Sequence, residues 1–252
     1  MDAVISCVAS RSGAPNDAWA VDYGINSIGL RAAKAAGVTQ FIMLSAICVQ
    51  RPLLEFQKAK LAFENELIAS GLSYSIIRPT AFFKSLSGQA NRLRRGKPFL
   101  VFGDGTLTAC KPISDRDLAR FMVNALVDTA YYNQILPIGG PGPALTPLDQ
   151  GHALATALGR PPKMRHVPVG VMDAIIGVLG LLGRVSDKAR AKADLARIGR
   201  YYATQSMLVW NPDTEQYVAD QTPEFGYDTL EQHYVRLALG EVEVDLGDHA
   251  VF

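Results

Sequence analysis

"TQFIMLSAICVQRPLLEFQKAK", Thr39 to Lys60, joins an apolar run to an amphipathic one. The run from Thr39 to Ser45 is almost continuously apolar, as expected for a strand that is buried on both faces of a sheet. After Pro52, apolar residues alternate with lysines at a spacing that predicts a helix. A buried strand followed by a helix is the building unit of a parallel α/β sheet.

The same alternation continues on both sides of this stretch. It predicts three parallel strands at about 3–9, 39–45 and 73–77, with a helix after each of the first two. The two helices are expected to end at Gly37 and Gly71, because glycine commonly follows the last turn of a helix. The predicted fold class is therefore α/β, with a doubly wound parallel sheet joined by right-handed crossovers.

The pattern changes in the second part of the chain. "KPFLVFGDGTLTACKPIS" predicts a hairpin near 98–113 that turns at Asp104-Gly105. We therefore expect an α/β domain over 1–160, with this hairpin inserted into it. A smaller, mostly helical region is expected over 161–252.

Composition excludes several classes of protein. Of the 252 residues, 48% are hydrophobic and 19% are charged, and the formal net charge is +1. Without a basic tract, non-specific nucleic-acid binding is not expected. The three cysteines are widely spaced and odd in number, which favours a reduced, cytoplasmic setting without disulfides. The four histidines lack metal-ligand spacing, so no metal site is predicted, and no signal peptide is expected.

One apolar stretch raises the question of a membrane. "VPVGVMDAIIGVLGLLG", Val167 to Gly183, is nearly all apolar but contains Asp173 and several glycines. It is short for a membrane span. Two interpretations stay open: a helix that is buried or lies at an interface, which we favour, and a helix that touches a membrane surface.

A phosphate-binding glycine loop is not apparent in this sequence. Nucleotide-binding sheets of this kind carry G-x-G-x-x-G between the first strand and its helix, where backbone N–H groups meet the pyrophosphate. The closest match is "GGPG", Gly139 to Gly142, which follows a strand but precedes a short loop and a proline-initiated helix. A glycine motif without its strand–loop–helix context is weak, so we expect no phosphate site there.

The order of these parts resembles the second half of an atypical short-chain dehydrogenase domain of the NmrA-like superfamily. More narrowly, several runs spread over nearly the whole chain resemble the divinyl chlorophyllide 8-vinyl reductases of chlorophyll and bacteriochlorophyll synthesis. These runs are "FIMLSAICVQRPLLEFQKAK", "YSIIRPTAFFKSLSGQ", "FGDGTLTACKPIS", "LPIGGPGPALTPLDQG" and "IGRYYATQSMLV".

The resemblance implies that 1–160 is part of an NAD(P)-binding Rossmann domain and 161–252 its substrate side. A family member would begin with three further strand–helix units that carry the glycine-rich loop. At about 25–30 residues per unit, roughly 70–80 residues or more would precede Met1. We therefore expect the N-terminal strands of the sheet to be missing, either because the start was assigned late or because the product is short.

The implied reaction is hydride transfer from NADPH to a vinyl group of a magnesium tetrapyrrole, either divinyl chlorophyllide or protochlorophyllide. Many reductases carry Tyr-x-x-x-Lys at this helix, whereas this chain has Phe56 and Lys60. A phenyl ring has no proton to give. The acceptor C=C is conjugated with the macrocycle, so charge spreads into the ring and no alkoxide forms beside a tyrosine. Phe56 thus suits reduction of carbon–carbon bonds and suits carbonyl reduction poorly.

Candidate site residues follow from this resemblance and from the strand ends. Lys60 would hold the nicotinamide ribose and place positive charge near the developing carbanion; its alternative is a solvated helix lysine. Ser45, at a carboxyl strand end, is the second catalytic candidate, and its alternative is a cap. The expected cofactor contacts are Cys7, Ala9, Ser10, Arg11, Ser45, Lys60, Pro79, Thr80 and Phe82.

The expected substrate contacts are less sharply defined. Aromatic residues would floor a flat macrocycle pocket, and a cation would meet the propionate carboxylate; ordinary core packing and solvated lysines are the alternatives. The candidates are Phe56, Phe83, Lys84, Lys111 and, more weakly, Arg94.

Two other functions remain open on the sequence. A nucleotide-sensing NmrA-like regulator would bind NADP without chemistry, and a truncated reductase would be inactive. Turnover of divinyl chlorophyllide separates the enzyme from the sensor. We expect a cytoplasmic protein, with peripheral association to photosynthetic membranes as an open alternative.

Overall fold

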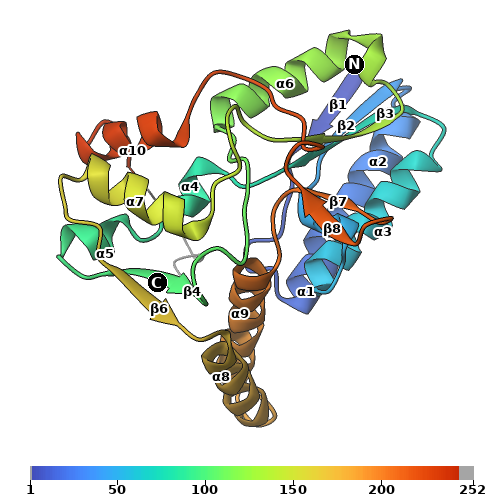
Figure 1. Cartoon of the computed structure of the whole chain (residues 1–252). Coiled ribbons are helices and arrows are strands. Elements are labelled where there is room, and N and C mark those ends of the chain that lie inside the picture. The colour runs from blue at the N-terminus through green and yellow to red at the C-terminus, as the bar shows by residue number, and fades with distance from the viewer. Residues whose placement is uncertain (1, 244–252) are drawn as a thin grey trace. The chain divides into compact units, whose positions relative to one another are not determined.

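The computed structural model describes residues 2–243 and divides into two compact units. Unit 1 comprises the described residues up to Thr80 together with Arg116–Ile138. Unit 2 comprises Ala81–Asp115 and the described residues from Gly139 onward. Figure 1 labels most elements of both units.

Unit 1 is built on a four-stranded parallel sheet in the order β1-β2-β3-β5. Residues Ala3, Val4 and Ile5 pair with Gln40, Phe41 and Ile42, and the next pair of strands is also parallel. The three predicted strands and their direction are confirmed. The strands are β1 (Ala3–Ser6), β2 (Gln40–Leu44), β3 (Ser73–Pro79) and β5 (Gln134–Ile138).

Helices lie on both faces of this sheet, as buried apolar strands require. On one face Phe41 meets Phe63 of α3 edge-on, with ring centroids 5.9 Å apart. On the other face the Gln40 side chain donates to the carbonyl of Ala125 in α6 at 3.1 Å. The helices are α1 (Pro15–Ala18), η1 (Trp19–Ile25), α2 (Asn26–Ala35), η2 (Ile47–Gln50), α3 (Glu55–Ile68), α6 (Asp115–Val127) and η3 (Thr129–Tyr131).

Unit 2 combines two small sheets with helices. Strands β4 (Phe99–Phe102) and β6 (Met164–Val167) run parallel, and β7 (Val209–Asn211) and β8 (Gln216–Val218) run antiparallel. The helices are α4 (Phe83–Leu86), α5 (Ala90–Arg94), α7 (Pro147–Ala157), α8 (Val169–Leu182), α9 (Asp187–Thr204) and α10 (Leu230–Ala238).

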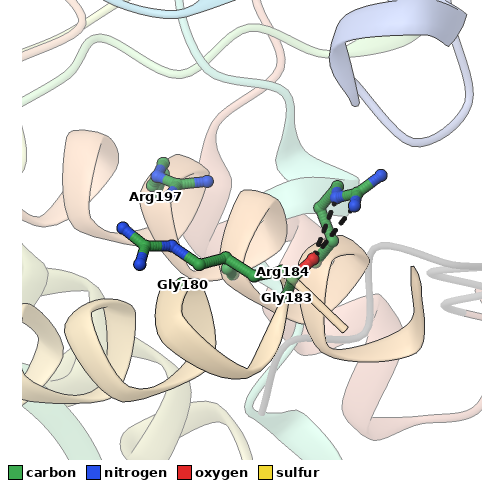
Figure 2. A pocket seen from close by; sticks show the side chains of 6 residues that line it. Gly180, Gly183, Arg184 and Arg197 are labelled. Atoms are coloured by element: carbon green, nitrogen blue, oxygen red, sulfur yellow. Dashed lines mark hydrogen bonds between the residues drawn. The ribbon is translucent and has the colours of Figure 1, made fainter. Parts of the chain in front are cut away.

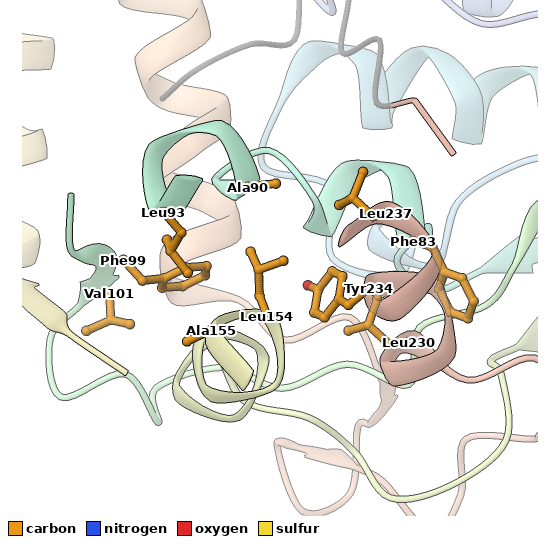
Figure 3. Close-up of a cluster of buried hydrophobic side chains, with 10 residues drawn as sticks. All are labelled: Phe83, Ala90, Leu93, Phe99, Val101, Leu154, Ala155, Leu230, Tyr234 and Leu237. Carbon is orange, nitrogen blue, oxygen red and sulfur yellow. The ribbon is translucent and has the colours of Figure 1, made fainter. Parts of the chain in front are cut away.

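The core of unit 2 gathers side chains from α4, α5, β4, α7 and α10 (Figure 3). Tyr234 is fully buried and donates its hydroxyl to the carbonyl of Leu86 at 3.0 Å, which satisfies its polar end. Gly151 of α7 faces Phe99 so closely that a Cβ would lie 2.9 Å from the ring. This core therefore ties the segment around 81–115 to the C-terminal half of the chain.

Three expectations differ from the structure. The hairpin near 98–113 does not form, because β4 pairs with the distant β6. The backbone of Cys110 forms isolated β-bridges with Leu145 and Met207 instead. The helix expected within 167–183 forms as α8. Met172 is the one residue of α8 that is buried, so the helix does not lie in the core. The structural division also differs from a boundary near residue 160, since unit 2 takes 81–115 and everything described from Gly139 onward.

Among residues 2–243, no helix has the combined length and apolar character that a membrane crossing requires.

Candidate active site

The carboxyl ends of the unit 1 strands carry the predicted polar residues. Ser45 follows β2, and its backbone N–H donates to the carbonyl of Ile77 at 2.7 Å. Thr80 follows β3, and its N–H donates to the carbonyl of Ile138 at 2.9 Å. Ser45, Pro79 and Thr80 are all buried. In open parallel sheets this edge is where ligands bind.

Helix α3 directs one face toward this sheet. Phe56, Lys60 and Glu64 stand four residues apart, so they lie along one face of the helix. Their exposed fractions are 9%, 6% and 0%. Just before the helix, the side-chain carbonyl of Gln57 accepts hydrogen bonds from the backbone N–H groups of Leu53 and Leu54, at 2.8 and 2.9 Å. This cap fixes where the helix begins and therefore which side chains face inward.

Lys60 is held by a buried ion pair. Its Nζ lies 2.8 Å from Asp22 Oδ1, and the two side chains are 8% and 0% exposed. An ammonium group has three N–H donors, and the remaining two have no protein acceptor in the part of the chain that is described. Lys58 differs, because it pairs with Glu55 on the surface and its side chain is 48% exposed. The interpretation of Lys60 as a solvated lysine is therefore wrong.

Asp22 also anchors the segment that follows β1. Its carboxylate accepts from the Ser10 hydroxyl at 2.5 Å and from the Ser10 backbone N–H at 3.2 Å. Asp22 sits in the π-helical segment Trp19–Ile25, a rare geometry that often occurs at functional sites. A single buried carboxylate thus links the segment after β1 to Lys60 of α3.

Asn26, one helical turn after Asp22, also holds the segment that follows β1. Its side-chain oxygen accepts from the Ser6 hydroxyl at 2.5 Å, and its amide donates to the carbonyl of Asp22 at 3.0 Å. The amide also approaches the carbonyl of Val8 at 3.4 Å. The end of β1 and the residues after it are therefore positioned by side chains of η1 and α2.

Ser45 belongs to a second buried network. Its hydroxyl donates to Glu64 Oε1 at 2.5 Å. Glu64 in turn pairs with Arg78 of β3, whose Nε donates to Oε1 at 3.2 Å and whose Nη2 contacts Oε2. Glu64 is thus shared between the end of β2 and the end of β3. This sharing links the hydroxyl of Ser45 to both strand ends.

The remaining predicted cofactor contacts of unit 1 lie on its surface. Cys7, Ala9 and Arg11 are exposed residues in the segment after β1. Ser10 is half-buried and is the residue of this segment that Asp22 binds. The structure therefore gathers four predicted residues at or beside the carboxyl edge of one sheet: Ser10, Ser45, Lys60 and Thr80. Cys7, Ala9 and Arg11 instead lie on the surface.

Unit 2 holds the remaining predicted contacts in different surroundings. Phe82 precedes α4 and forms a parallel bridge with Ile113. Phe83 is 5% exposed and packs in the core, with its ring 5.3 Å from that of His233. Lys84 is exposed. Phe83 therefore has the ordinary core surroundings that were its alternative interpretation.

Lys111 is buried beside a carboxylate. Its Nζ lies 2.5 Å from Glu224 Oε1, and the Lys111 side chain is 9% exposed. A hydrogen bond from Lys111 and another from the Gly142 backbone hold the pKa of Glu224 below its usual range. The ammonium is thus engaged within the protein, in contrast to that of Lys84.

The "GGPG" segment has a packing role. A Cβ on Gly140 would lie 2.0 Å from the carbonyl oxygen of Pro112, and one on Gly139 would lie 2.8 Å from Lys111 Cβ. The backbone N–H of Gly140 donates to the Lys111 carbonyl at 3.1 Å. These glycines are needed because two segments approach closely, which accounts for the motif without a phosphate.

The described residues offer no evident metal centre. Across 2–243, no group of three or more histidine, cysteine, aspartate or glutamate side chains is placed to hold an ion. Burial raises the pKa of the Cys110 thiol to about 12, which keeps that thiol protonated and unreactive.

Three residues of the site were missed from the sequence: Asp22, Glu64 and Arg78. The spacing Lys60-x-x-x-Glu64 was available as a signal, since it places both residues on one helix face. Asp22 gave no such signal, because its partners lie at sequence distances that only the folded sheet brings together.

The fold is shared with solved nucleotide-dependent enzymes. An NADPH-dependent quinone oxidoreductase from Escherichia coli, solved with NADPH, matches with a TM-score of 0.62 at 16% identity, covering 93% of this chain and 75% of that one. A nucleoside-diphosphate-sugar epimerase from Staphylococcus aureus matches with a TM-score of 0.62 at 14% identity, covering 93% and 76%. These likenesses show a Rossmann-type fold.

Sequence relatives are closer. Two plant proteins named divinyl chlorophyllide a 8-vinyl-reductase, chloroplastic, match: one from Cucumis sativus at 50% identity over 100% of this chain, and one from Zea mays at 48% over 99%. An NAD(P)H azoreductase from Xenophilus azovorans is 30% identical over 60% of this chain and 52% of its own length. The chain spans 62% and 64% of the two plant relatives.

The first half of the chain carries the family assignment. Residues 1–129 match the family described as NAD(P)H-binding. This stretch contains the three strands, the buried Lys60 and the carboxyl edge described above. Because the match covers just over half of the 252 residues, the chain belongs to the NAD(P)H-binding family.

Proposed function

We propose that this protein takes part in the NADPH-dependent reduction of the 8-vinyl group of divinyl chlorophyllide or protochlorophyllide to ethyl. The names of the plant relatives, at about half identity along the whole chain, support this substrate. Membership of the NAD(P)H-binding family supports the cofactor.

The main support for this reaction is the pair of residues on the buried face of α3. Phe56 and Lys60 occupy the positions where a carbonyl reductase would have a tyrosine acid and its lysine. The Phe56 ring is 9% exposed and offers no proton, while the Lys60 ammonium lies 2.8 Å from Asp22. A site with a fixed cation and no hydroxyl acid at that position suits an acceptor whose charge spreads into a conjugated ring.

The residues at the carboxyl edge fit the nicotinamide end of the cofactor. Ser10, Ser45, Thr80 and Lys60 supply hydroxyl and ammonium groups of the kind that bind ribose hydroxyls and a carboxamide. Bound NADPH supplies the hydride. The chain itself would hold the ribose through Lys60, keep that lysine oriented through Asp22, and position Ser45 through Glu64.

We assign the substrate contacts within unit 2 unequally. Lys84 is exposed and can meet a propionate carboxylate at little desolvation cost. Lys111 would have to leave Glu224 first, and Phe83 is 5% exposed within the core. Lys84 is therefore the preferred carboxylate contact of the two predicted lysines.

We further propose a cytoplasmic location, with peripheral association to a membrane surface as the alternative. The plant relatives are named chloroplastic, and the magnesium tetrapyrrole proposed as substrate is largely apolar. A cytoplasmic location of this chain stays a prediction.

The direct test is turnover. Purified protein is incubated with NADPH and divinyl chlorophyllide a, and the monovinyl product is separated by chromatography, with the cucumber relative as positive control. Product formation that requires NADPH supports the proposal. Micromolar NADPH binding with no product from either divinyl substrate, while the control is active, would instead favour a nucleotide sensor.

A further inference from the structure

Helix α8 exposes a continuous apolar stripe. Along the helix and just beyond it, large apolar side chains recur every three or four residues, which places them on one face. Their exposed fractions run from 45% to 87%. The stripe consists of Val171, Ile175, Val178, Leu181, Leu182 and Val185. At 1.5 Å per residue it extends for about 21 Å.

The opposite face of α8 is occupied by α9. Met172 is 7% exposed, and Ala193 of α9 is 1% exposed. Asp173 and Arg200 connect the two helices through an ion pair between exposed side chains. Since α9 covers this side, the apolar stripe is the face of the helical hairpin that its own partner helix leaves open.

Positive charge is concentrated in and beside the same hairpin. Residues 160–200 contain nine lysines and arginines against three aspartates, a net charge of +6, whereas the whole chain carries +1. This excess is a local feature, since the rest of the chain is net acidic. Exposed cations of this density attract anionic surfaces.

Three arginines line a hollow between α8 and α9 (Figure 2). Gly180 and Gly183 open the floor of this hollow, and Arg184, Arg190 and Arg197 stand around it. The Arg190 guanidinium donates to the carbonyl of Gly183 at 3.0 and 3.2 Å, and Arg197 pairs with Asp194 at 2.6 Å, so the protein itself holds two of the three. Arg184 has no side-chain acceptor in the described part of the chain, so its guanidinium is available to an outside anion.

Shape and charge together identify the occupant. A tetrapyrrole would require a concave pocket, whereas this stripe is the outward face of a helix about 21 Å long. A second copy would bring two segments of net charge +6 together, which repulsion opposes. An apolar face beside a segment of net positive charge instead matches the interface of a bilayer that contains anionic lipids.

We propose that the α8–α9 hairpin docks on an anionic phospholipid surface. The stripe from Val171 to Val185 inserts among the acyl chains near the headgroups, and the arginine hollow receives a lipid phosphate. Docking would lie in the plane of the interface, with the axis of α8 along the membrane surface. The inference depends on the hairpin and the residues just before it, and it stands whether or not the protein reduces a vinyl group.

The test is flotation of the protein with vesicles of phosphatidylcholine alone and of phosphatidylcholine with phosphatidylglycerol. Binding is expected to the anionic vesicles and to fall as salt is raised from about 0.05 to 0.5 M, because salt screens surface charge. Val178→Asp should weaken binding at least tenfold, since it places a charge in the apolar stripe. Arg184→Gln should weaken it about fivefold, the effect of one interfacial cation.

Matched controls come from exposed residues elsewhere. Val127→Asp changes an apolar residue of α6 that is 70% exposed, and Lys97→Gln removes an exposed cation outside the hairpin. Both should bind vesicles as the unaltered protein does. Circular dichroism and thermal unfolding verify that each variant is folded.

Three outcomes would overturn the proposal. The first is equal binding to neutral and anionic vesicles, or none to either. The second is equal weakening by the hairpin variants and their controls. The third is a dimer, seen by light scattering without lipid, that Val178→Asp dissociates while vesicle binding persists, which would assign the stripe to a second copy.

Discussion

Lys60 Nζ lies 2.8 Å from Asp22 Oδ1, in a pair whose side chains are 8% and 0% exposed. The pair joins α3 to the π-helical segment before α2, and Asp22 extends it to Ser10. Two opposite charges buried together hold each other in place, because either one alone would be costly to bury. The site therefore has a fixed cation before any cofactor arrives.

Lys60→Ala should lower the rate of vinyl reduction, or the affinity for NADPH, about ten- to a hundredfold, the loss of one charge-assisted contact. Lys58→Ala is the matched control, because Lys58 lies on the same helix and pairs with Glu55 at the surface. Steady-state kinetics and NADPH titration measure both effects. Equal, small losses in the two variants would reduce Lys60 to a structural residue.

Asp22→Asn should destabilise the fold by about 3 kcal/mol, because it leaves the Lys60 ammonium buried without its counter-charge. The stability losses of the single variants Asp22→Asn and Lys60→Met should sum to more than the loss in the double variant, since the sum counts their shared interaction twice. Urea unfolding measures all three. Asp17→Asn is the control: Asp17 lies nearby and accepts from Ser12 at an exposed position, so its loss should stay under about 1 kcal/mol.

Phe56→Tyr tests whether an acid was lost from this site or is not required by its reaction. A positioned general acid contributes about 10²–10⁴-fold, so a missing acid would give a gain of that size when restored. We expect no gain in vinyl reduction, as the acceptor charge spreads into a ring. The measurement is kcat/KM with divinyl chlorophyllide, and Phe63→Tyr, at a core position on the same helix, controls for the added hydroxyl.

Much of the fold was readable because burial on both faces leaves a simple pattern. Ser73–Pro79 and Gln40–Leu44 were found as apolar runs between glycine-ended helices. The prediction of a hairpin near 98–113 was wrong, because a turn motif is local whereas the strand that pairs with 99–102 lies far along the chain. Asp104 does accept from the Thr106 N–H at 2.8 Å, so the turn exists, but β4 pairs with β6.

The site was predictable where a residue's position along the chain fixes its place. Ser45 and Thr80 follow strands, and Lys60 follows by helix spacing. Asp22 was not predictable, because a π-helical segment changes which side chains of a helix face inward. Its partners Ser10 and Lys60 meet it only once the sheet has formed.

The pair Lys111–Glu224 makes a prediction about pH. Hydrogen bonds from Lys111 and from Gly142 lower the pKa of Glu224. A lowered folded pKa gives stability that is present above the unfolded value, about 4.3, and is lost as pH falls through the folded value. Glu224→Gln should therefore lose less stability between about pH 6 and pH 3 than the unaltered protein does.

The size of this pH effect is expected to be modest. The Glu224 side chain is 43% exposed, so the difference in the free energy of unfolding should stay below about 1 kcal/mol. Urea unfolding at several pH values measures it, with Glu231→Gln as a control that leaves the pair intact. Identical pH dependence in the protein and in Glu224→Gln would contradict the assignment.

Gly140→Ala separates packing from phosphate binding in "GGPG". A Cβ there would lie 2.0 Å from the Pro112 carbonyl oxygen, so the backbone must move and stability should fall by about 3 kcal/mol or more. Gly29→Ala is the control, because its Cβ meets nothing within 4 Å and helix propensity should raise stability by about 0.5–1 kcal/mol. Thermal unfolding and NADPH titration are measured together. If "GGPG" were a phosphate loop, Gly140→Ala would leave stability unchanged and weaken NADPH binding, since the glycines of such a loop let the cofactor approach. We expect lower stability and unchanged NADPH affinity, because the atoms that fill this space belong to the chain's own backbone.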